Sequence, residues 1–262
     1  MSNRNILGKE IFSRQIEMEE TRDPRRKIKL DSVQNLRDLG GYSCANDRKT
    51  RWGVFFRSGD MSAVSEVDQR ALLAKDIRSV IDLRMTKEIE AAPNVFVESH
   101  ELFFINHDFW GTRFDNYRSI RKTATPNEKL ADLYCSGLEI NGFVMAEIMK
   151  TFAYQKGGFI FHCRSGKDRT GLVAAILLSI AGVPFDTICA DFALSSEYLN
   201  EPELTQEELK TPGAYQKGSA PETMKLTLTF LNQRYGGVVE YLEQQGVSNA
   251  EIELIRKKIV DD

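Results

Sequence analysis

The chain reads His162-Cys163-Arg164-Ser165-Gly166-Lys167-Asp168-Arg169-Thr170-Gly171 a little past its middle. The four residues before it, 158–161, are short and apolar, which is typical of a buried strand. The apolar run after it, 172–178, is typical of a buried helix. We therefore expect a loop at a strand-to-helix junction, with the backbone N–H groups of the helix N-terminus pointing into it. Such a terminus binds phosphate through its free donors and the helix dipole.

The loop combines a nucleophile with groups that bind phosphate. Cys163 is expected to attack phosphorus as a thiolate, which the helix N-terminus stabilises, and to form a phosphocysteine. Arg169 presents a planar fork of donors that suits two phosphate oxygens. Gly166 lets the backbone curl without a Cβ in the way of the phosphate. The Thr170 hydroxyl is expected to reach the sulfur and to stabilise it as a leaving thiolate.

The remaining loop residues are expected to supply charge or order. Arg164 and Lys167 add positive charge at the rim, and His162 orders the loop rather than acting as a base. The predicted phosphate-binding residues are Arg164, Ser165, Gly166, Lys167, Asp168 and Arg169. A nucleotide-binding P-loop is excluded, because that motif requires glycine and Ser or Thr where Phe161 and Asp168 stand.

The Cys-x5-Arg pattern matches the signature of protein tyrosine phosphatases and dual-specificity phosphatases. Its Gly-Lys-Asp-Arg-Thr-Gly ending, together with the upstream segment at 35–42, resembles a narrower bacterial and fungal tyrosine-phosphatase-like family. Segments at 56–58, 82–84 and 191–195 are also similar to that family. The resemblance implies a protein tyrosine phosphatase-like fold. It also implies hydrolysis of phosphotyrosine and, in several members, of phosphoinositides.

The proton donor for the leaving oxygen has three candidates. Cleavage of a phosphate ester needs a proton on the leaving oxygen. Asp108 follows a predicted strand and could supply it, although an aspartate in a loop often caps a neighbouring turn instead. The family resemblance implicates the aspartate before the loop arginine, which is Asp168, and we favour this residue. Asp82 is the third candidate.

The upstream segment allows two interpretations. In the first, Arg37 and Asp38 form a structural ion pair beside a tight glycine turn. In the second, Asn35, Arg37 or Asp38 orders the phosphate loop from behind. Arg57 and Arg84 are interpreted as surface or scaffold arginines rather than as phosphate ligands.

Composition narrows the class of protein. The 262 residues are 42% hydrophobic and 28% charged, which is enough for one large core or two small ones. A net charge of −3 argues against general nucleic-acid binding. Four scattered cysteines do not suggest a disulfide framework, and three histidines without ligand spacing suggest no metal site. No cofactor is expected, and the sequence indicates no oligomeric state.

The order of the predicted elements indicates the fold class. Predicted strands at 54–56, 80–83, 102–105 and 158–161 alternate with helices, which predicts an α/β fold with a mostly parallel central sheet flanked by helices. Residues 1–28 are expected to form an N-terminal polar arm. Residues 29–262 are expected to form a single phosphatase domain with a helical C-terminal part. Within it, residues 197–221 are expected to form a mobile insertion near the pocket.

The N-terminus lacks the apolar core of a signal peptide, and the longest apolar run is too short to span a bilayer. We therefore predict no transmembrane segment and a cytoplasmic protein, with export by a non-classical route as the open alternative.

The expected partner is a phosphorylated protein or a phosphoinositide, bound as substrate. Arg164 and Lys167 would be free to meet the extra phosphates of an inositol ring. Phosphotyrosine would gain from an aromatic wall, which Phe109, Trp110 or Tyr117 could supply. We therefore expect activity on both substrates. The alternative is a catalytically weak pseudophosphatase that binds phospho-ligands in the same loop.

Overall fold

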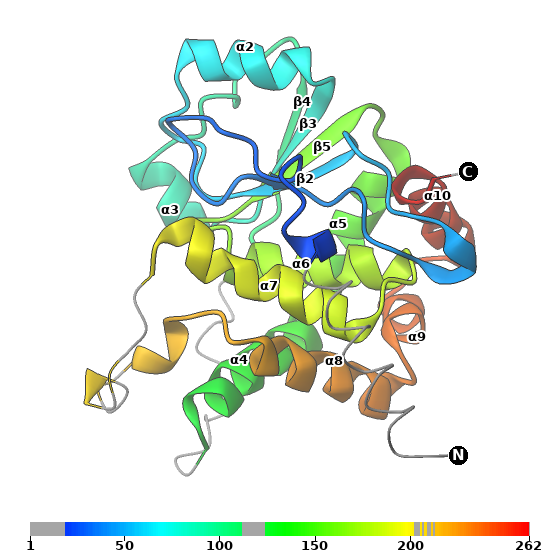
Figure 1. The fold of residues 1–262 in the computed structure, drawn as a ribbon. Helices are drawn as coiled ribbons and strands as arrows, with labels where there is room; N and C mark the ends of the chain where they lie inside the picture. The colour runs from blue at the N-terminus through cyan, green and yellow to red at the C-terminus, as the bar shows by residue number, and fades with distance from the viewer. Residues whose placement is uncertain are drawn as a thin grey trace.

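The computed structural model of the protein describes residues 19–111, 124–201, 205, 207, 208, 211 and 213–261. A five-stranded sheet runs through it, with helices on both faces (Figure 1). The strands are β1 (Arg37–Asp38), β2 (Phe55–Ser58), β3 (Ile77–Asp82), β4 (Phe103–Asn106) and β5 (Gly158–His162). The helices are α2 (Glu66–Ala74), α3 (Thr86–Ala91), α4 (Pro126–Ile140), α5 (Gly142–Tyr154), α6 (Asp168–Ile180), α7 (Phe185–Leu199), α8 (Pro221–Tyr235), α9 (Val238–Gln244) and α10 (Asn249–Ile259). The described ranges also hold two short 3-10 helices, η1 (Ala45–Asp47) and η4 (Ala214–Gln216).

The sheet has the order β1-β2-β5-β3-β4, with β5 at its centre. β2, β5, β3 and β4 are parallel, and only the two-residue β1 is antiparallel, at one edge. The expected α/β fold with a mostly parallel sheet is confirmed. Because parallel strands end at the same edge of a sheet, the segments that follow β2, β3 and β5 meet there.

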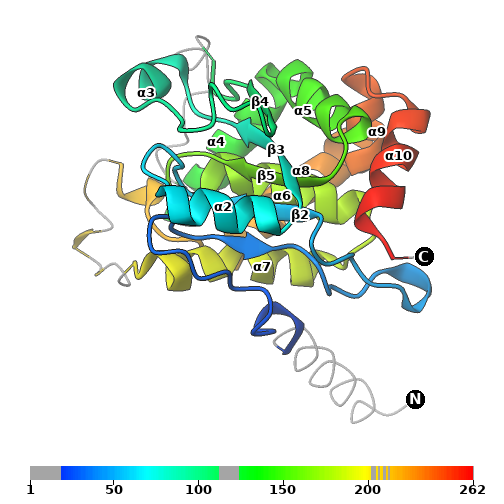
Figure 2. The same ribbon diagram turned by 90° about the horizontal axis from the view of Figure 1, so that it is seen from above.

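Side chains of the central strands alternate between the two faces of the sheet, and each face has its own core. Phe159 and Phe161 of β5 belong to a large cluster with helices α4 to α10, whereas Ile160 between them belongs to a smaller cluster that includes Leu72 of α2. In the view from above of Figure 2, α2 lies in front of the strands, and Figure 1 shows α5 and α6 on their other side. Burial on both faces explains why residues 158–161 of this strand are all apolar.

Helix ends follow their local sequence signals. The Ser65 side chain accepts a hydrogen bond from the Asp68 backbone N–H at the start of α2. Ser248 and Glu251 form a capping box at the start of α10. Asn141 separates α4 from α5. Such caps satisfy backbone donors that would otherwise lack partners.

A buried arginine helps to attach the residues before the sheet to the rest of the fold. Arg26 is fully buried, and its guanidinium donates to the carbonyl oxygens of Asp38 (2.8 Å) and Glu20 (2.9 Å). Its guanidinium carbon also lies 3.6 Å from the centre of the Tyr42 ring. Residues 1–18 of the predicted polar arm lie outside the described residues, so the boundary at residue 28 stays a prediction. No helix within the described ranges has the length and apolar character needed to cross a membrane.

Candidate active site

The Cys-x5-Arg loop lies at the C-terminal edge of the sheet. It leaves the central strand β5 at His162, and α6 begins at Asp168, so the helix N-terminus points into the loop as expected. The loop packs on the turn after β2, where the Asp60 N–H donates to the Arg164 carbonyl at 2.9 Å. Gly166 has a φ of 72°, and a Cβ on it would lie 2.4 Å from the Ser58 carbonyl oxygen. Only glycine fits at this position.

Cys163 and Arg169, the first and last residues of the Cys-x5-Arg pattern, interact electrostatically. Cys163 is buried, with 1% of its surface exposed, and forms no disulfide. Burial alone would lower the pKa of Arg169, but the charge of a Cys163 thiolate and the carboxylate of Glu88 outweigh burial and raise that pKa. Arg169 is therefore a permanent cation whose charge acts on the sulfur.

Glu88, which the sequence analysis did not select, fixes the guanidinium of Arg169. Its two carboxylate oxygens accept hydrogen bonds from Nη1 (2.5 Å) and Nη2 (3.1 Å) of Arg169. Glu88 also caps its own helix α3, because Oε2 accepts from the Met85 backbone N–H at 2.8 Å. In a sequence, a glutamate three residues after the start of a helix indicates a helix cap. Nothing in the sequence indicated that Glu88 also binds Arg169.

His162 is locked behind the loop. Its Nε2 lies 2.8 Å from Asn94 Nδ2 and 3.4 Å from Asp82 Oδ2, and its Nδ1 lies 3.2 Å from the Cys163 carbonyl oxygen. Burial lowers the pKa of His162. A ring held this way is suited to ordering the loop, as the sequence analysis expected.

The three candidate proton donors have different surroundings. Asp82 is fully buried and is engaged by Arg84, whose Nη2 lies 2.7 Å from Oδ2. Asp108 accepts from the Gly111 N–H at 2.7 Å and so caps a turn, the structural role considered for it above. Asp168 is half-buried at the first position of α6, inside the loop. The geometry thus favours Asp168.

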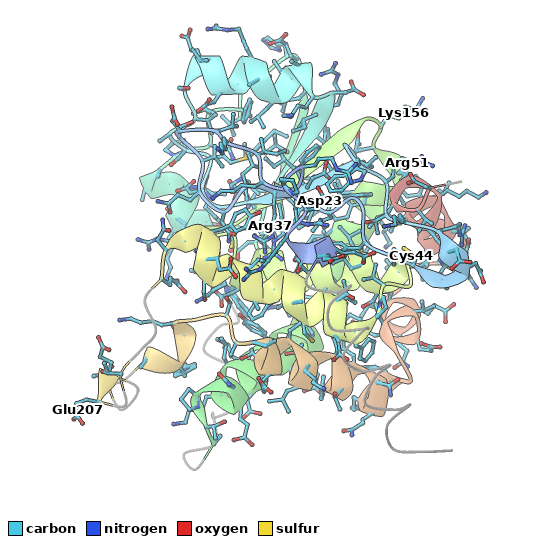
Figure 3. The ribbon with its side chains drawn as sticks, viewed as in Figure 1. Asp23, Arg37, Cys44, Arg51, Lys156 and Glu207 are labelled. Carbon is cyan, nitrogen blue, oxygen red and sulfur yellow. The ribbon has the colours of Figure 1, made fainter. Side chains whose placement is uncertain are left out.

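Two buried arginines brace the loop from behind. Arg57 donates from Nη2 to the Gly166 carbonyl (2.8 Å), and its Nη1 lies 2.6 Å from Asp191 Oδ2. Arg37 lies between the sheet and α7, with its Nε 3.1 Å from Asp191 Oδ1 (Figure 3). Asp191 belongs to one of the segments similar to the phosphatase family, but its role could not be read from sequence. Arg57 is a scaffold arginine, as one of its two interpretations held.

The upstream segment corresponds to the second of its two interpretations. Asn35 donates from Nδ2 to the Ser165 carbonyl at 3.0 Å, and its Oδ1 accepts from Arg37. The Arg37–Asp38 ion pair of the first interpretation is not formed, because Arg37 pairs with Asp191 instead. Asp38 accepts from the backbone N–H groups of residues 40 and 53, at 2.8 Å each, and so stabilises the glycine turn.

The expected charge at the rim needs a correction at Lys167. Its Nζ donates to the Gln216 carbonyl at 2.7 Å and lies 3.9 Å from Glu201 Oε1, and only 3% of the residue is exposed. Lys167 is therefore not free to meet a phosphate, because the segment after α7 covers it. Arg164 is exposed at the rim, as expected.

Two further expectations for the pocket are not met. The Thr170 hydroxyl is buried and has no hydrogen-bond partner in the described part of the chain, so it does not bond the sulfur here. Phe109 and Trp110 are core residues rather than an open aromatic wall. The Trp110 ring packs so closely on α4 that a Cβ at Gly137 would lie 2.5 Å from it. Tyr117 lies outside the described residues.

Comparison with known proteins decides the family. A sequence model of the tyrosine phosphatase family matches residues 28–261. The chain belongs to the tyrosine phosphatase family. This phosphatase is accordingly a phosphoric monoester hydrolase of the protein tyrosine phosphatase type. Within the described ranges, no group of His, Cys, Asp and Glu side chains could hold a metal ion.

Individual relatives agree with the family. This phosphatase is 28% identical to a tyrosine-protein phosphatase of Nostoc commune, over 79% of this chain and 74% of the relative. It is 24% identical to the triple specificity protein phosphatase PtpB of Mycobacterium tuberculosis, over 87% and 96%. A crystal structure of P. aeruginosa TpbA in complex with phosphotyrosine aligns with 80% of this chain and 99% of its own, at 12% identity and a TM-score of 0.32.

Asp191→Asn should destabilise this phosphatase in a pH-dependent way. Burial alone would raise the pKa of Asp191, but Arg37 and Arg57 hold it well below its ordinary value of 3.8. A carboxylate whose pKa is lower in the folded than in the unfolded state stabilises the fold fully at pH values above its unfolded-state pKa. This stabilisation is lost as the pH falls from there through the folded-state pKa. We expect the variant to lose about 3–5 kcal/mol of unfolding free energy at neutral pH, and progressively less below about pH 4.

Urea denaturation at several pH values measures both quantities. Asp186→Asn is the matched control, because Asp186 lies on the same helix and is exposed. We expect its effect to stay under about 1 kcal/mol. An Asp191→Asn loss that is small, or that does not change between neutral and acidic pH, would contradict the role of the two ion pairs.

Proposed function

We propose that this phosphatase hydrolyses phosphotyrosine, and phosphoinositides as a second substrate class, through a phosphocysteine and without a metal ion. The observation that carries the proposal is the position of Cys163, which is buried in the loop that leads into α6 and interacts electrostatically with the buried cation Arg169. Backbone N–H groups and a guanidinium together neutralise a phosphate dianion without a divalent cation.

The first chemical step transfers the phosphoryl group to sulfur. The Cys163 thiolate attacks phosphorus, an S–P bond forms, and the bond from phosphorus to the leaving oxygen breaks. The N–H groups of the loop and the guanidinium of Arg169 stabilise the charge on the phosphoryl oxygens. Asp168, in its protonated form, gives its proton to the leaving oxygen.

The second step restores the thiolate. A water molecule attacks the phosphorus of the phosphocysteine, and the S–P bond breaks with its electron pair on sulfur. The Asp168 carboxylate, left without its proton by the first step, accepts a proton from the water. Inorganic phosphate then leaves, and the enzyme is ready for another cycle.

Support for a second substrate class comes from the rim of the loop. The mycobacterial relative is named for triple specificity, so the family includes broad acceptors. Since Lys167 is covered by the segment after α7, Arg164 is the rim cation available to a second phosphate. The proposed contact with an inositol phosphate therefore moves from Lys167 to Arg164.

We also propose that residues 29–262 form a single domain and that the protein is cytoplasmic. One cluster of the core runs from Leu39 to Val260, which supports a single domain over residues 29–262. A catalytic thiol must stay reduced, which favours a reducing compartment such as the cytoplasm.

Turnover should need the thiol and no metal. We expect hydrolysis of para-nitrophenyl phosphate to persist in excess chelator. Alkylation of Cys163 should abolish it, and Cys163→Ser should abolish turnover while still binding vanadate, because the loop donors remain in place. A steady-state assay measures turnover, and a vanadate titration measures binding. Activity lost on chelation and restored by magnesium or zinc would refute a metal-independent mechanism, and vanadate binding without any turnover by the wild type would indicate a pseudophosphatase.

Asp168→Asn should slow substrates with poor leaving groups selectively. A good leaving group departs without a proton, so we expect a loss in kcat/KM of about a hundredfold or more for phenyl phosphate and a small one for dinitrophenyl phosphate. Asp108→Asn is the control and should be mild with both, since Asp108 caps a turn. If the leaving-group effect followed Asp108→Asn instead, the proton donor would be Asp108.

Arg164→Ala should lower phosphoinositide hydrolysis about five- to tenfold more than phosphotyrosine hydrolysis, because one exposed charged contact is lost. Lys167→Ala should affect both substrates equally, since its Nζ binds the Gln216 carbonyl. Exposed Arg48, outside the loop, provides the control Arg48→Ala. Phosphate release from vesicles that contain phosphoinositide and from a phosphotyrosine peptide measures the ratio. A ratio unchanged in Arg164→Ala would remove the support for the lipid substrate.

A further inference from the structure

A buried tyrosine from a distant helix contacts the proposed proton donor. Tyr134 lies on α4 and is fully buried, and its hydroxyl donates to Asp168 Oδ1 at 2.5 Å. Its ring packs edge-on against Phe192 of α7, with 6.1 Å between the ring centres. The tyrosine is thus held by two helices, and its hydroxyl has a fixed direction.

Asp168 has no comparable second partner. Over the described ranges, the Tyr134 hydroxyl is the one donor that hydrogen-bonds the Asp168 carboxylate, and it engages Oδ1. Oδ2 is left without a protein donor in the same ranges. A carboxylate on a helix N-terminus can rotate about its side-chain torsions unless something holds it. The bond from Tyr134 supplies that restraint.

We propose that Tyr134 is the positioning residue for Asp168, and that its hydroxyl directs proton exchange with substrate and water to Oδ2. This inference rests on the proposed role of Asp168 as proton donor. When Asp168 is protonated, its proton sits on Oδ2, because Oδ1 already accepts from the phenol. The proton moves from Oδ2 to the leaving oxygen in the first step. The attacking water returns a proton to Oδ2 in the second.

Tyr134 itself keeps its proton through the cycle. Burial, and then the negative charge of Asp168, raise the pKa of Tyr134 well above its ordinary value, and the charge of Cys163 acts in the same direction. The phenol is therefore a constant hydrogen-bond donor and not an acid in its own right. Its effect on catalysis passes through Asp168.

The experiment compares Tyr134→Phe with Tyr241→Phe. Tyr241, on α9, is also fully buried, and its hydroxyl donates to the Leu138 carbonyl of α4 (2.9 Å), away from the loop. Each variant removes one buried hydroxyl that donates a hydrogen bond to another helix. We expect Tyr134→Phe to lower kcat/KM for phenyl phosphate about tenfold, the scale of one lost hydrogen bond to a charged group. The kcat/KM for dinitrophenyl phosphate and the affinity for vanadate should stay nearly unchanged. Tyr241→Phe should show no leaving-group dependence.

The double variant Asp168→Asn, Tyr134→Phe separates the possible outcomes. If Tyr134 acts through Asp168, the second substitution adds no further loss to the first. Equal losses on both leaving groups in Tyr134→Phe, or a further loss in the double variant, would overturn this inference alone. If Asp168→Asn itself showed no leaving-group dependence, the proposed role of Asp168 would fall, and the positioning role with it.

Discussion

A single buried carboxylate holds the active-site loop in place. Asp191 lies between Arg37 and Arg57, and all three side chains are almost completely shielded from water. Two guanidinium groups buried without a counter-charge would be strongly unfavourable, so the carboxylate on α7 makes the arrangement possible. Arg57 in turn restrains the loop through its hydrogen bond to the Gly166 carbonyl. The site therefore relies on charge pairs that never contact the substrate.

The sequence was sufficient to predict those structural features whose signal lies within a few neighbouring residues. The apolar run at 158–161, the loop after it and the apolar run at 172–178 predicted a strand, a turn and a helix, and the structure has all three. The parallel sheet followed from the alternation of strands and helices. These features depend on periodicity and on backbone chemistry within a few residues, which a single sequence contains.

Sequence was insufficient where a side chain takes its partner from a distant segment. Lys167 looked like a free cation because nothing in the sequence placed Gln216 over it. Glu88 and Tyr134 gave no sign of their contacts with Arg169 and Asp168, for the same reason. Trp110 looked like a pocket wall, but the close approach of Gly137 on α4 draws it into the core. Only the tertiary structure decides among such partners.

The position of Asp191 in the chain has a consequence for biosynthesis. The bond from Arg37 to Asp191 spans 154 residues, the one from Arg57 spans 134, and the bond from Asn35 to Ser165 spans 130. Contacts so far apart form only after long loops have closed, which slows folding. As the protein leaves the ribosome, Cys163 emerges before the carboxylate of Asp191, which orders the loop around it. The nascent chain thus carries Cys163 without a formed loop around it until most of the protein has been made.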